Sequence, residues 1–182
     1  MTFPMLETNR FMLIEIENKH LDEIYQIFSN EDVTKYYGMS PFTNESQAKV
    51  MIESFRTRFE NKQGMRWGIM EKETNRLIGT IGLNNLLLSS KKTEIGYDLL
   101  PTYWGKGMMS EAINEVITYC FQTLSLFRIG AVIFPENIAS SKVIEKFGFQ
   151  KEGLLRGYIY QNEESHNVFV YSLLKTDWEK NV

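Results

Sequence analysis

The sequence predicts an α+β fold: a mixed, mostly antiparallel sheet of about six or seven strands, flanked by about four helices. Two observations support this class. Helical spacing of apolar residues in the first third of the chain gives way, from Met65, to three strand-like runs joined by turn-rich segments. Further on, a strand, a glycine loop, a helix and a buried strand follow one another, which indicates a right-handed crossover between parallel strands.

Composition favours a single domain over residues 1–182, because 43% of the residues are hydrophobic and no linker or repeat divides the chain. Lys and Arg number 20 against 23 Asp and Glu, so a net charge of -3 gives no basic footprint for nucleic acid. The chain shows no secretory segment and no long apolar run. We therefore expect a cytoplasmic protein without a membrane partner.

The first elements are expected to be one strand and two helices. Residues 10–16 form a short apolar run that is typical of an opening strand. A first helix should end near Ser29 or Asn30, and its apolar face consists of Leu21, Ile24, Ile27 and Phe28. A second helix should begin near Asn44, which can form a capping box with Gln47.

The middle of the chain reads as an antiparallel meander followed by a crossover. Residues 65–70, 76–83 and 93–100 are the three expected strands. The stretch YWGKGMMSEA, residues 103–112, then leads into a helix whose apolar face includes Cys120. We expect Cys120 to be a core residue rather than a nucleophile, and a single cysteine excludes an internal disulfide.

The last elements are a buried strand, a helix and two further strands. Residues 127–134 are apolar enough to form a buried strand. A helix is expected from about Ile138 to Phe147, where Gly148 stops it. Strands near residues 158–161 and 167–174 should complete the sheet.

The glycine loop is the first candidate site. Gly105 and Gly107 leave the backbone uncovered, so N–H groups at the start of the following helix can converge on an anion. They can equally serve only to turn the chain. A nucleotide triphosphatase and a Rossmann dehydrogenase are disfavoured, because no Gly-Lys-Ser/Thr occurs and Ser110 stands where the third glycine of G-x-G-x-x-G would be.

Two longer stretches, TEIGYDLLPTYWGKGMMSEAI and PENIASSKVIEKFGFQKEG, resemble the GNAT superfamily of acetyl-coenzyme A (acetyl-CoA) dependent N-acetyltransferases. LETNRFML, EDVTKYYGMSPFTNESQA and ESHNVFVYSLLKTDW are similar to its ribosomal-protein N-acetyltransferase branch, called RimJ/RimL-like. These ordered matches cover nearly the whole chain. The resemblance implies a sheet that is splayed at the cofactor site, and an acyltransferase that moves acetyl from acetyl-CoA to a primary amine.

The resemblance also implies where the cofactor binds. The pantetheine arm would lie in the gap beside Leu99 and Leu100 and bond to the backbone. The pyrophosphate would meet backbone N–H groups of Gly105, Lys106, Gly107, Met108, Met109 and Ser110. Family members prefer Gln or Arg at the position of Thr102, so we expect one side-chain contact to the phosphates to be missing.

Asn137 and Ser140 form N-x-x-S at the start of the last helix, which is also the spacing of an N-cap. In the family, this Asn contacts the cofactor arm and this Ser can donate a hydrogen bond to the departing thiolate. Many members use a tyrosine general acid at the position of Ile144. Ser140 is the natural substitute, and the alternatives are Tyr97, Tyr158 and Tyr160.

Direct attack on the thioester requires a neutral amine, and the pKa of an alkyl amine is about 10 and that of an α-amino group about 8. Glu94 is the first choice of general base, acting through water, although it can equally be a surface carboxylate. A glutamate of some ribosomal-protein acetyltransferases aligns with Ile159. A backbone N–H near Leu99 can stabilise the oxyanion, so no acetyl-enzyme is required.

Two classes of acceptor amine stay open: a protein N-terminal amine, such as that of a ribosomal protein, and a small amine. Trp67, Tyr36, Tyr37 and Phe42 can line the acceptor pocket or belong to the core. The absence of the family's Tyr and Glu keeps an alternative function open, an acetyl-CoA-binding sensor with little catalytic activity. Dimers are common in the family, so the resemblance leaves both a monomer and a homodimer open.

The two histidines predict no metal site. His20 is expected at the surface or in a helix cap, and His166 in a structural hydrogen bond. Neither has a second histidine or a cysteine near it in the sequence.

Overall fold

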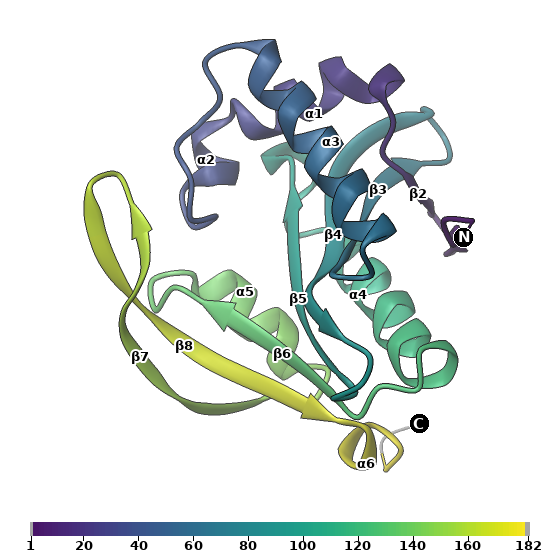
Figure 1. Ribbon diagram of the computed structural model, residues 1–182, viewed down its shortest axis with the longest axis vertical. Coiled ribbons are helices and arrows are strands. Elements are labelled where there is room, and N and C mark those ends of the chain that lie inside the picture. The colour runs from purple at the N-terminus through teal and green to yellow at the C-terminus, as the bar shows by residue number, and fades with distance from the viewer. Residues whose placement is uncertain (1, 181–182) are drawn as a thin grey trace.

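The structure is a computed structural model that describes residues 2–180. Within that range eight strands form one sheet in the order β1-β2-β3-β4-β5-β6-β8-β7 (Figure 1). The strands are β1 Leu6–Glu7, β2 Phe11–Glu15, β3 Met65–Glu71, β4 Arg76–Leu87, β5 Lys92–Leu99, β6 Arg128–Ile133, β7 Gln150–Gln161 and β8 Glu164–Leu174. The predicted fold class is confirmed, with β1 as an additional short strand.

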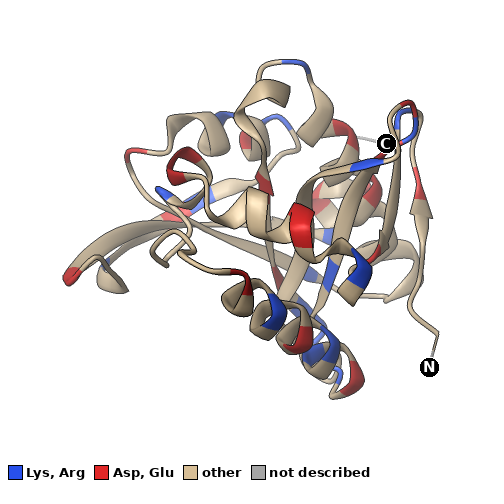
Figure 2. Cartoon of the chain, turned by 90° about the horizontal axis from the view of Figure 1, so that it is seen from above, with Lys and Arg blue, Asp and Glu red and all other residues tan. Residues whose placement is uncertain are grey.

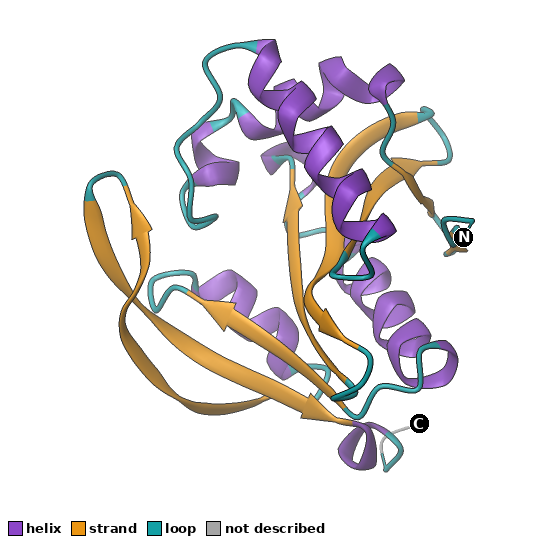
Figure 3. Ribbon diagram, viewed as in Figure 1, coloured by secondary structure: helices purple, strands orange, loops and turns teal. Residues whose placement is uncertain are grey.

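Four α-helices within residues 2–180 correspond to the predicted helices, and two short α-helices add to them. The helices are α1 Leu21–Phe28, α2 Glu31–Thr34, α3 Glu45–Glu60, α4 Met108–Thr118, α5 Ile138–Glu145 and α6 Lys175–Trp178. Figure 3 shows α3 in front of the strands and α4 and α5 behind them. The central strands of the sheet are therefore covered on both faces, whereas β7 is exposed.

Local capping explains where the main helices begin. Asn44 and Gln47 form the predicted capping box at the start of α3. The side chain of Asn137 accepts a hydrogen bond from the Ser140 backbone N–H at the start of α5. After α5, Gly148 adopts a φ of +86°, which a glycine reaches without steric cost and which ends the helical segment.

The predicted meander is formed by β3, β4 and β5, which pair in antiparallel fashion. The next pair is parallel: Lys92, Thr93 and Glu94 of β5 lie opposite Arg128, Ile129 and Gly130 of β6. Beyond these three pairs the strands separate, and Figure 1 shows β5 running upward while β6 turns away to the left. Residues 95–99 of β5 consequently have no partner strand on that side, which leaves backbone groups facing the gap.

Two hydrophobic cores lie on the two faces of the sheet. The larger one packs α4 against the strands, and Trp67, Ile113, Val116 and Ile129 are fully buried within it. The smaller one packs α1 and α3 against the sheet through residues such as Ile24, Phe28 and Ala48. Burial of these apolar side chains supplies the main favourable free energy of folding.

A buried polar cluster crosses the sheet beside the gap. The carboxylate of Asp98 in β5 accepts hydrogen bonds from the Thr80 backbone N–H at 2.9 Å and from the Thr80 hydroxyl at 2.6 Å. Arg66 Nη1 in β3 lies 3.4 Å from the same hydroxyl oxygen. Burial raises the pKa of Asp98 to about 6, although the Arg66 charge and the Thr80 hydrogen bonds act in the opposite direction.

The far end of the β7–β8 hairpin is tied to the segment between α2 and α3. The buried Gln161 amide donates to the carbonyl oxygens of Thr34 and Met39, both at 3.0 Å. Its side-chain oxygen accepts from the Gly38 N–H at 3.0 Å. One glutamine thus holds a segment that lies more than 120 residues away in the sequence.

Charged side chains are distributed over the molecule without segregation by sign. Figure 2 shows Lys and Arg interspersed with Asp and Glu along the same helices and loops. No helix formed by residues 2–180 has the length and apolar character needed to cross a membrane.

Gln161→Ala should lower the free energy of unfolding by about 1–3 kcal/mol, because the buried Thr34 carbonyl group and the partly buried Met39 carbonyl and Gly38 N–H groups lose their partner. Urea denaturation measures the change. Gln150→Ala, at the exposed opposite end of β7, is the matched control and should stay within about 0.5 kcal/mol of the native protein. Equal stability of the two variants would contradict the role of Gln161.

Asp98→Asn should change how stability depends on pH. The folded-state pKa of about 6 lies above the usual 3.8, so the folded protein binds more protons than the unfolded chain between about pH 4 and pH 6. The contribution of Asp98 to the free energy of unfolding therefore falls as the pH rises through that window. In the Asp98→Asn variant this contribution does not change with pH, because the amide does not ionise. Denaturation curves from pH 4 to 7 measure the native-minus-variant difference, and a difference that is constant with pH would disprove the assignment.

Candidate active site

The gap between β5 and β6 opens into a cavity of about 700 Å³. Its walls come from β5, β6, α3, the start of α5 and the segment between α2 and α3. The volume lies within the range of about 300–1,000 Å³ that small-molecule and cofactor sites occupy. Of the predicted site residues, Glu94, Asn137 and Ser140 line this cavity together.

The glycine loop lies where the chain leaves β5 and enters α4. Gly105 and Gly107 have φ values of +72° and +69°, so a left-handed backbone accounts for both glycines. A Cβ atom at either position would meet nothing within 4 Å, so the space above the loop is open. Gly107 is the N-cap of α4 and brings no side chain to it, which leaves N–H groups of Met108, Met109 and Ser110 available for an anion.

The lysine of the loop folds back on the loop itself. Lys106 Nζ donates to the Thr102 carbonyl oxygen at 2.8 Å and lies 5.6 Å from the centre of the Tyr103 ring. The Lys106 carbonyl oxygen accepts a hydrogen bond from Arg10 Nη1 at 3.1 Å. The cation and the carbonyl group of Lys106 are thus both engaged within the protein.

Leu99 and Leu100 differ in what they offer to a ligand. The Leu100 N–H donates to the Ile78 carbonyl oxygen of β4 at 2.9 Å. Because successive N–H groups along a strand point to opposite sides, the Leu99 N–H faces the gap. The Leu99 carbonyl oxygen accepts from the Trp104 indole N–H at 2.6 Å. Of these two leucines, Leu99 is therefore the one whose backbone N–H faces the gap, and neither leucine is among the residues that line the cavity.

Ser140 is bordered by Tyr97 on the opposite wall of the gap. The Tyr97 hydroxyl donates to the Ser140 carbonyl oxygen at 3.3 Å. Burial raises the pKa of Tyr97 to about 12, although the hydrogen bond to Ser140 lowers it, so the phenol stays protonated and neutral. Ile144 is fully buried and does not line the cavity. Tyr158 and Tyr160 are exposed on β7 and also lie outside the lining.

Glu94 stands at the point where the two strands begin to separate. It is opposite Gly130 in the last of the three β5–β6 pairs, and its side chain is half-buried. Asn85 Nδ2 donates to Glu94 Oε2 at 3.0 Å. A hydrogen bond of this kind holds the carboxylate in the cavity wall, at the narrow end of the gap.

The sequence interpretation missed Arg66, a buried cation in the cavity wall. Its guanidinium donates to the Gly96 carbonyl oxygen at 3.0 Å and to Asn84 Oδ1 at 3.3 Å. The only sequence signal is a charged residue inside the apolar strand MRWGIM. Arg58 of α3 lines the same cavity, so two cations and Glu94 are its formally charged residues.

The four aromatic residues considered for the acceptor pocket separate into two groups. Tyr36, Tyr37 and Phe42 line the cavity. Trp67 does not: it is fully buried in the larger core, and its indole N–H donates to the Pro4 carbonyl oxygen at 2.7 Å. For Trp67 the core alternative is therefore confirmed, because its side chain points from β3 to the α4 face of the sheet.

Cys120 and the histidines are structural. Burial raises the pKa of the Cys120 thiol, so this core cysteine is a poor nucleophile. His20 is buried rather than on the surface, and its Nδ1 accepts from the Glu17 N–H at 3.0 Å, which confirms the capping alternative. His166 Nε2 lies 3.1 Å from the Gln161 carbonyl oxygen, the expected structural contact. Residues 2–180 contain no group of three His, Cys, Asp or Glu side chains that could hold a metal ion.

Known proteins share both the sequence and the architecture. The uncharacterized N-acetyltransferase YoaA of Bacillus subtilis (strain 168) is 44% identical over 95% of this chain and 98% of its own length. The [ribosomal protein uS5]-alanine N-acetyltransferase of Escherichia coli (strain K12) is 28% identical over 65% of this chain and 62% of its own length.

A solved structure, spermidine N-acetyltransferase from Vibrio cholerae in complex with CoA and spermine, superposes with a TM-score of 0.82. It covers 93% of this chain and 98% of its own, at 21% identity, and so supports the fold. The acetyltransferase (GNAT) domain family matches residues 10–150. With a sheet splayed between β5 and β6 and a family match over most of its length, the chain belongs to the GNAT acetyltransferases.

Proposed function

We propose that this enzyme, a single domain over residues 1–182, transfers acetyl from acetyl-CoA to a primary amine by direct nucleophilic attack. The observation that carries the proposal is the continuity of two features: the unpaired side of β5, and the open glycine loop that follows it. A pantetheine arm can form hydrogen bonds with the unpaired backbone of β5, and a pyrophosphate can accept hydrogen bonds from the N–H groups of the glycine loop and the start of α4.

The residues of the glycine loop fit a pyrophosphate. Gly105 and Gly107 leave open space above the backbone, and no side chain caps α4. We assign the N–H groups of Gly105, Lys106, Gly107, Met108, Met109 and Ser110 to the phosphates. Leu99 and Asn137 are assigned to the pantetheine arm. Leu100 is a weaker candidate than Leu99, since its N–H already bonds to β4.

The proposed reaction needs one base and one donor. The amine nitrogen forms a bond to the thioester carbon, while the Leu99 N–H stabilises the oxyanion and the C–S bond then breaks. The amine proton passes through water to Glu94, in the wall of the cavity. The Ser140 hydroxyl donates a hydrogen bond to the departing thiolate, and the neutral Tyr97 phenol beside it is the alternative donor.

The acceptor is proposed to be a protein N-terminal amine or a small amine. The relatives support both classes, because one acts on a ribosomal protein and one solved structure contains a polyamine. An acceptor panel tests them: peptides with ribosomal-protein N-termini, polyamines, amino acids and aminoglycosides, with free thiol as the readout. If the protein binds acetyl-CoA but releases no free thiol with any amine of the panel, transfer to these classes is contradicted and the sensor alternative is favoured. The observation that supports this alternative is Ile144, which is buried at the position of the family's tyrosine.

Gly107→Val should raise the Kd for acetyl-CoA about tenfold or more, because a β-branched residue is strained by about 1–3 kcal/mol at a left-handed φ. Isothermal titration calorimetry measures the Kd. Gly153→Val on β7, where a Cβ atom also meets nothing within 4 Å, is the control and should bind as the native protein does. Absence of binding by the native protein would refute the proposed function.

Glu94→Gln should lower kcat about 10²–10⁴-fold, because the amide cannot accept the amine proton. The Kd for acetyl-CoA should stay unchanged, since the amide keeps the size and the acceptor oxygen of the side chain. Steady-state kinetics with the best acceptor of the panel measures kcat, and Glu73→Gln in the exposed turn before β4 is the control. A native kcat in Glu94→Gln would remove Glu94 from the mechanism.

A further inference from the structure

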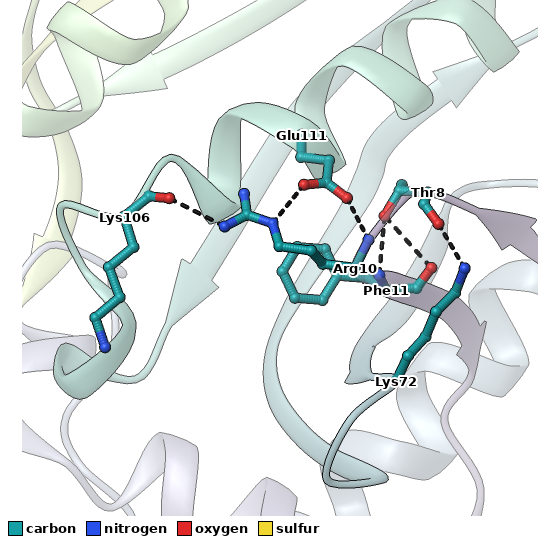
Figure 4. A network of polar contacts seen from close by, with 6 residues as sticks. All are labelled: Thr8, Arg10, Phe11, Lys72, Lys106 and Glu111. Atoms are coloured by element: carbon teal, nitrogen blue, oxygen red, sulfur yellow. Dashed lines mark hydrogen bonds and ion pairs between the residues drawn. The ribbon is translucent and has the colours of Figure 1, made fainter.

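We infer that Arg10, the residue before β2, is a positioning residue for the glycine loop; this inference rests on the proposed cofactor site. Figure 4 shows Arg10 between the loop and the first turn of α4. Its Nε donates to Glu111 Oε2 at 2.7 Å, and its backbone N–H donates to Glu111 Oε1 at 2.7 Å. Its Nη1 donates to the Lys106 carbonyl oxygen at 3.1 Å.

The contact with Lys106 fixes the direction of one peptide group in the loop. In a trans peptide the C=O of one residue and the N–H of the next point in opposite directions. Arg10 draws the Lys106 carbonyl oxygen toward itself, and the Gly107 N–H consequently points away from Arg10. The negative end of this peptide dipole, the carbonyl oxygen, therefore faces Arg10, and the positive end, the N–H group, faces the open side of the loop.

The contact with Glu111 neutralises a carboxylate at the same helix terminus. Glu111 lies in the first turn of α4, where the N–H groups assigned to the pyrophosphate also lie. Burial raises the pKa of Glu111, but hydrogen bonds from Thr8 and Arg10 outweigh that effect and lower it, so the group is ionised at neutral pH. An unpaired carboxylate there would repel an anionic ligand, and Arg10 removes that repulsion.

The solvent exposure of the Arg10–Glu111 ion pair predicts that it affects ligand binding more than stability. The Arg10 side chain is 40% exposed and that of Glu111 is 21% exposed. Ion pairs this accessible to water contribute little to global stability. The same contacts act directly on the orientation and charge of the loop, so the loss of Arg10 should affect binding of the pyrophosphate more than folding.

The test compares two acetyl donors that differ at the phosphates. Arg10→Gln should raise the KM for acetyl-CoA about tenfold, because a charged hydrogen bond and a neutralising charge are lost. With S-acetyl-pantetheine, which has no pyrophosphate, kcat/KM should stay within about twofold of the native value, since only the phosphate contacts depend on Arg10. The melting temperature should change little.

Arg128→Gln is the matched control, because Arg128 also pairs with a carboxylate, that of Glu152, at similar exposure and away from the loop. It should leave the KM for acetyl-CoA unchanged. Equal losses of Arg10→Gln with both donors would show a general structural defect, and an unchanged KM for acetyl-CoA would show no positioning role; either result overturns the inference. Failure of the native protein to use or bind acetyl-CoA would instead refute the proposed function, so the two failures are distinct.

Discussion

Three residue pairs hold β5 to β6, and pairing stops immediately after Glu94 and Gly130. Two neighbouring strands normally stay hydrogen-bonded along their whole length, because a buried backbone group without a partner raises the free energy of the folded state. Here α5 and the β7–β8 hairpin follow β6 away from β5, and the backbone of β5 borders a cavity instead. The base, the oxyanion donor and the thiolate donor that we propose all depend on this separation.

The cavity also depends on polar groups that are held inside the sheet. Arg66 reaches across β4 to the Gly96 carbonyl oxygen of β5, and it does so over Gly82. A Cβ atom on Gly82 would lie 2.8 Å from Arg66 Nε and 2.3 Å from the Met65 carbonyl oxygen, so a side chain is excluded there. With Thr80 and Asp98, Arg66 forms a satisfied cluster, which makes this wall of the cavity rigid as well as charged.

Local patterns in the sequence were sufficient for most of the fold. The capping box of Asn44, the cap of Asn137 and the meander all depend on residues close together in the chain. The hairpin was only partly predicted, because β7 is exposed on both faces and shows no alternation of polar and apolar residues. Contacts between distant segments leave no pattern in the sequence. Arg10 and Glu111 are 101 residues apart, and the hydrogen bond from Trp67 to Pro4 joins residues that are 63 apart.

Gln161 anchors residues 34–39, so the cavity is complete only after the ribosome has synthesised β7. Tyr36 and Tyr37 belong to this segment, and their wall of the cavity is fixed by a side chain that emerges more than 120 residues later. Contacts of such long separation in sequence form late, because the entropy of closing the intervening loop must be overcome first. A chain that ends before β7 lacks Gln161, so the wall of the cavity formed by Tyr36 and Tyr37 has no anchor until β7 has been made.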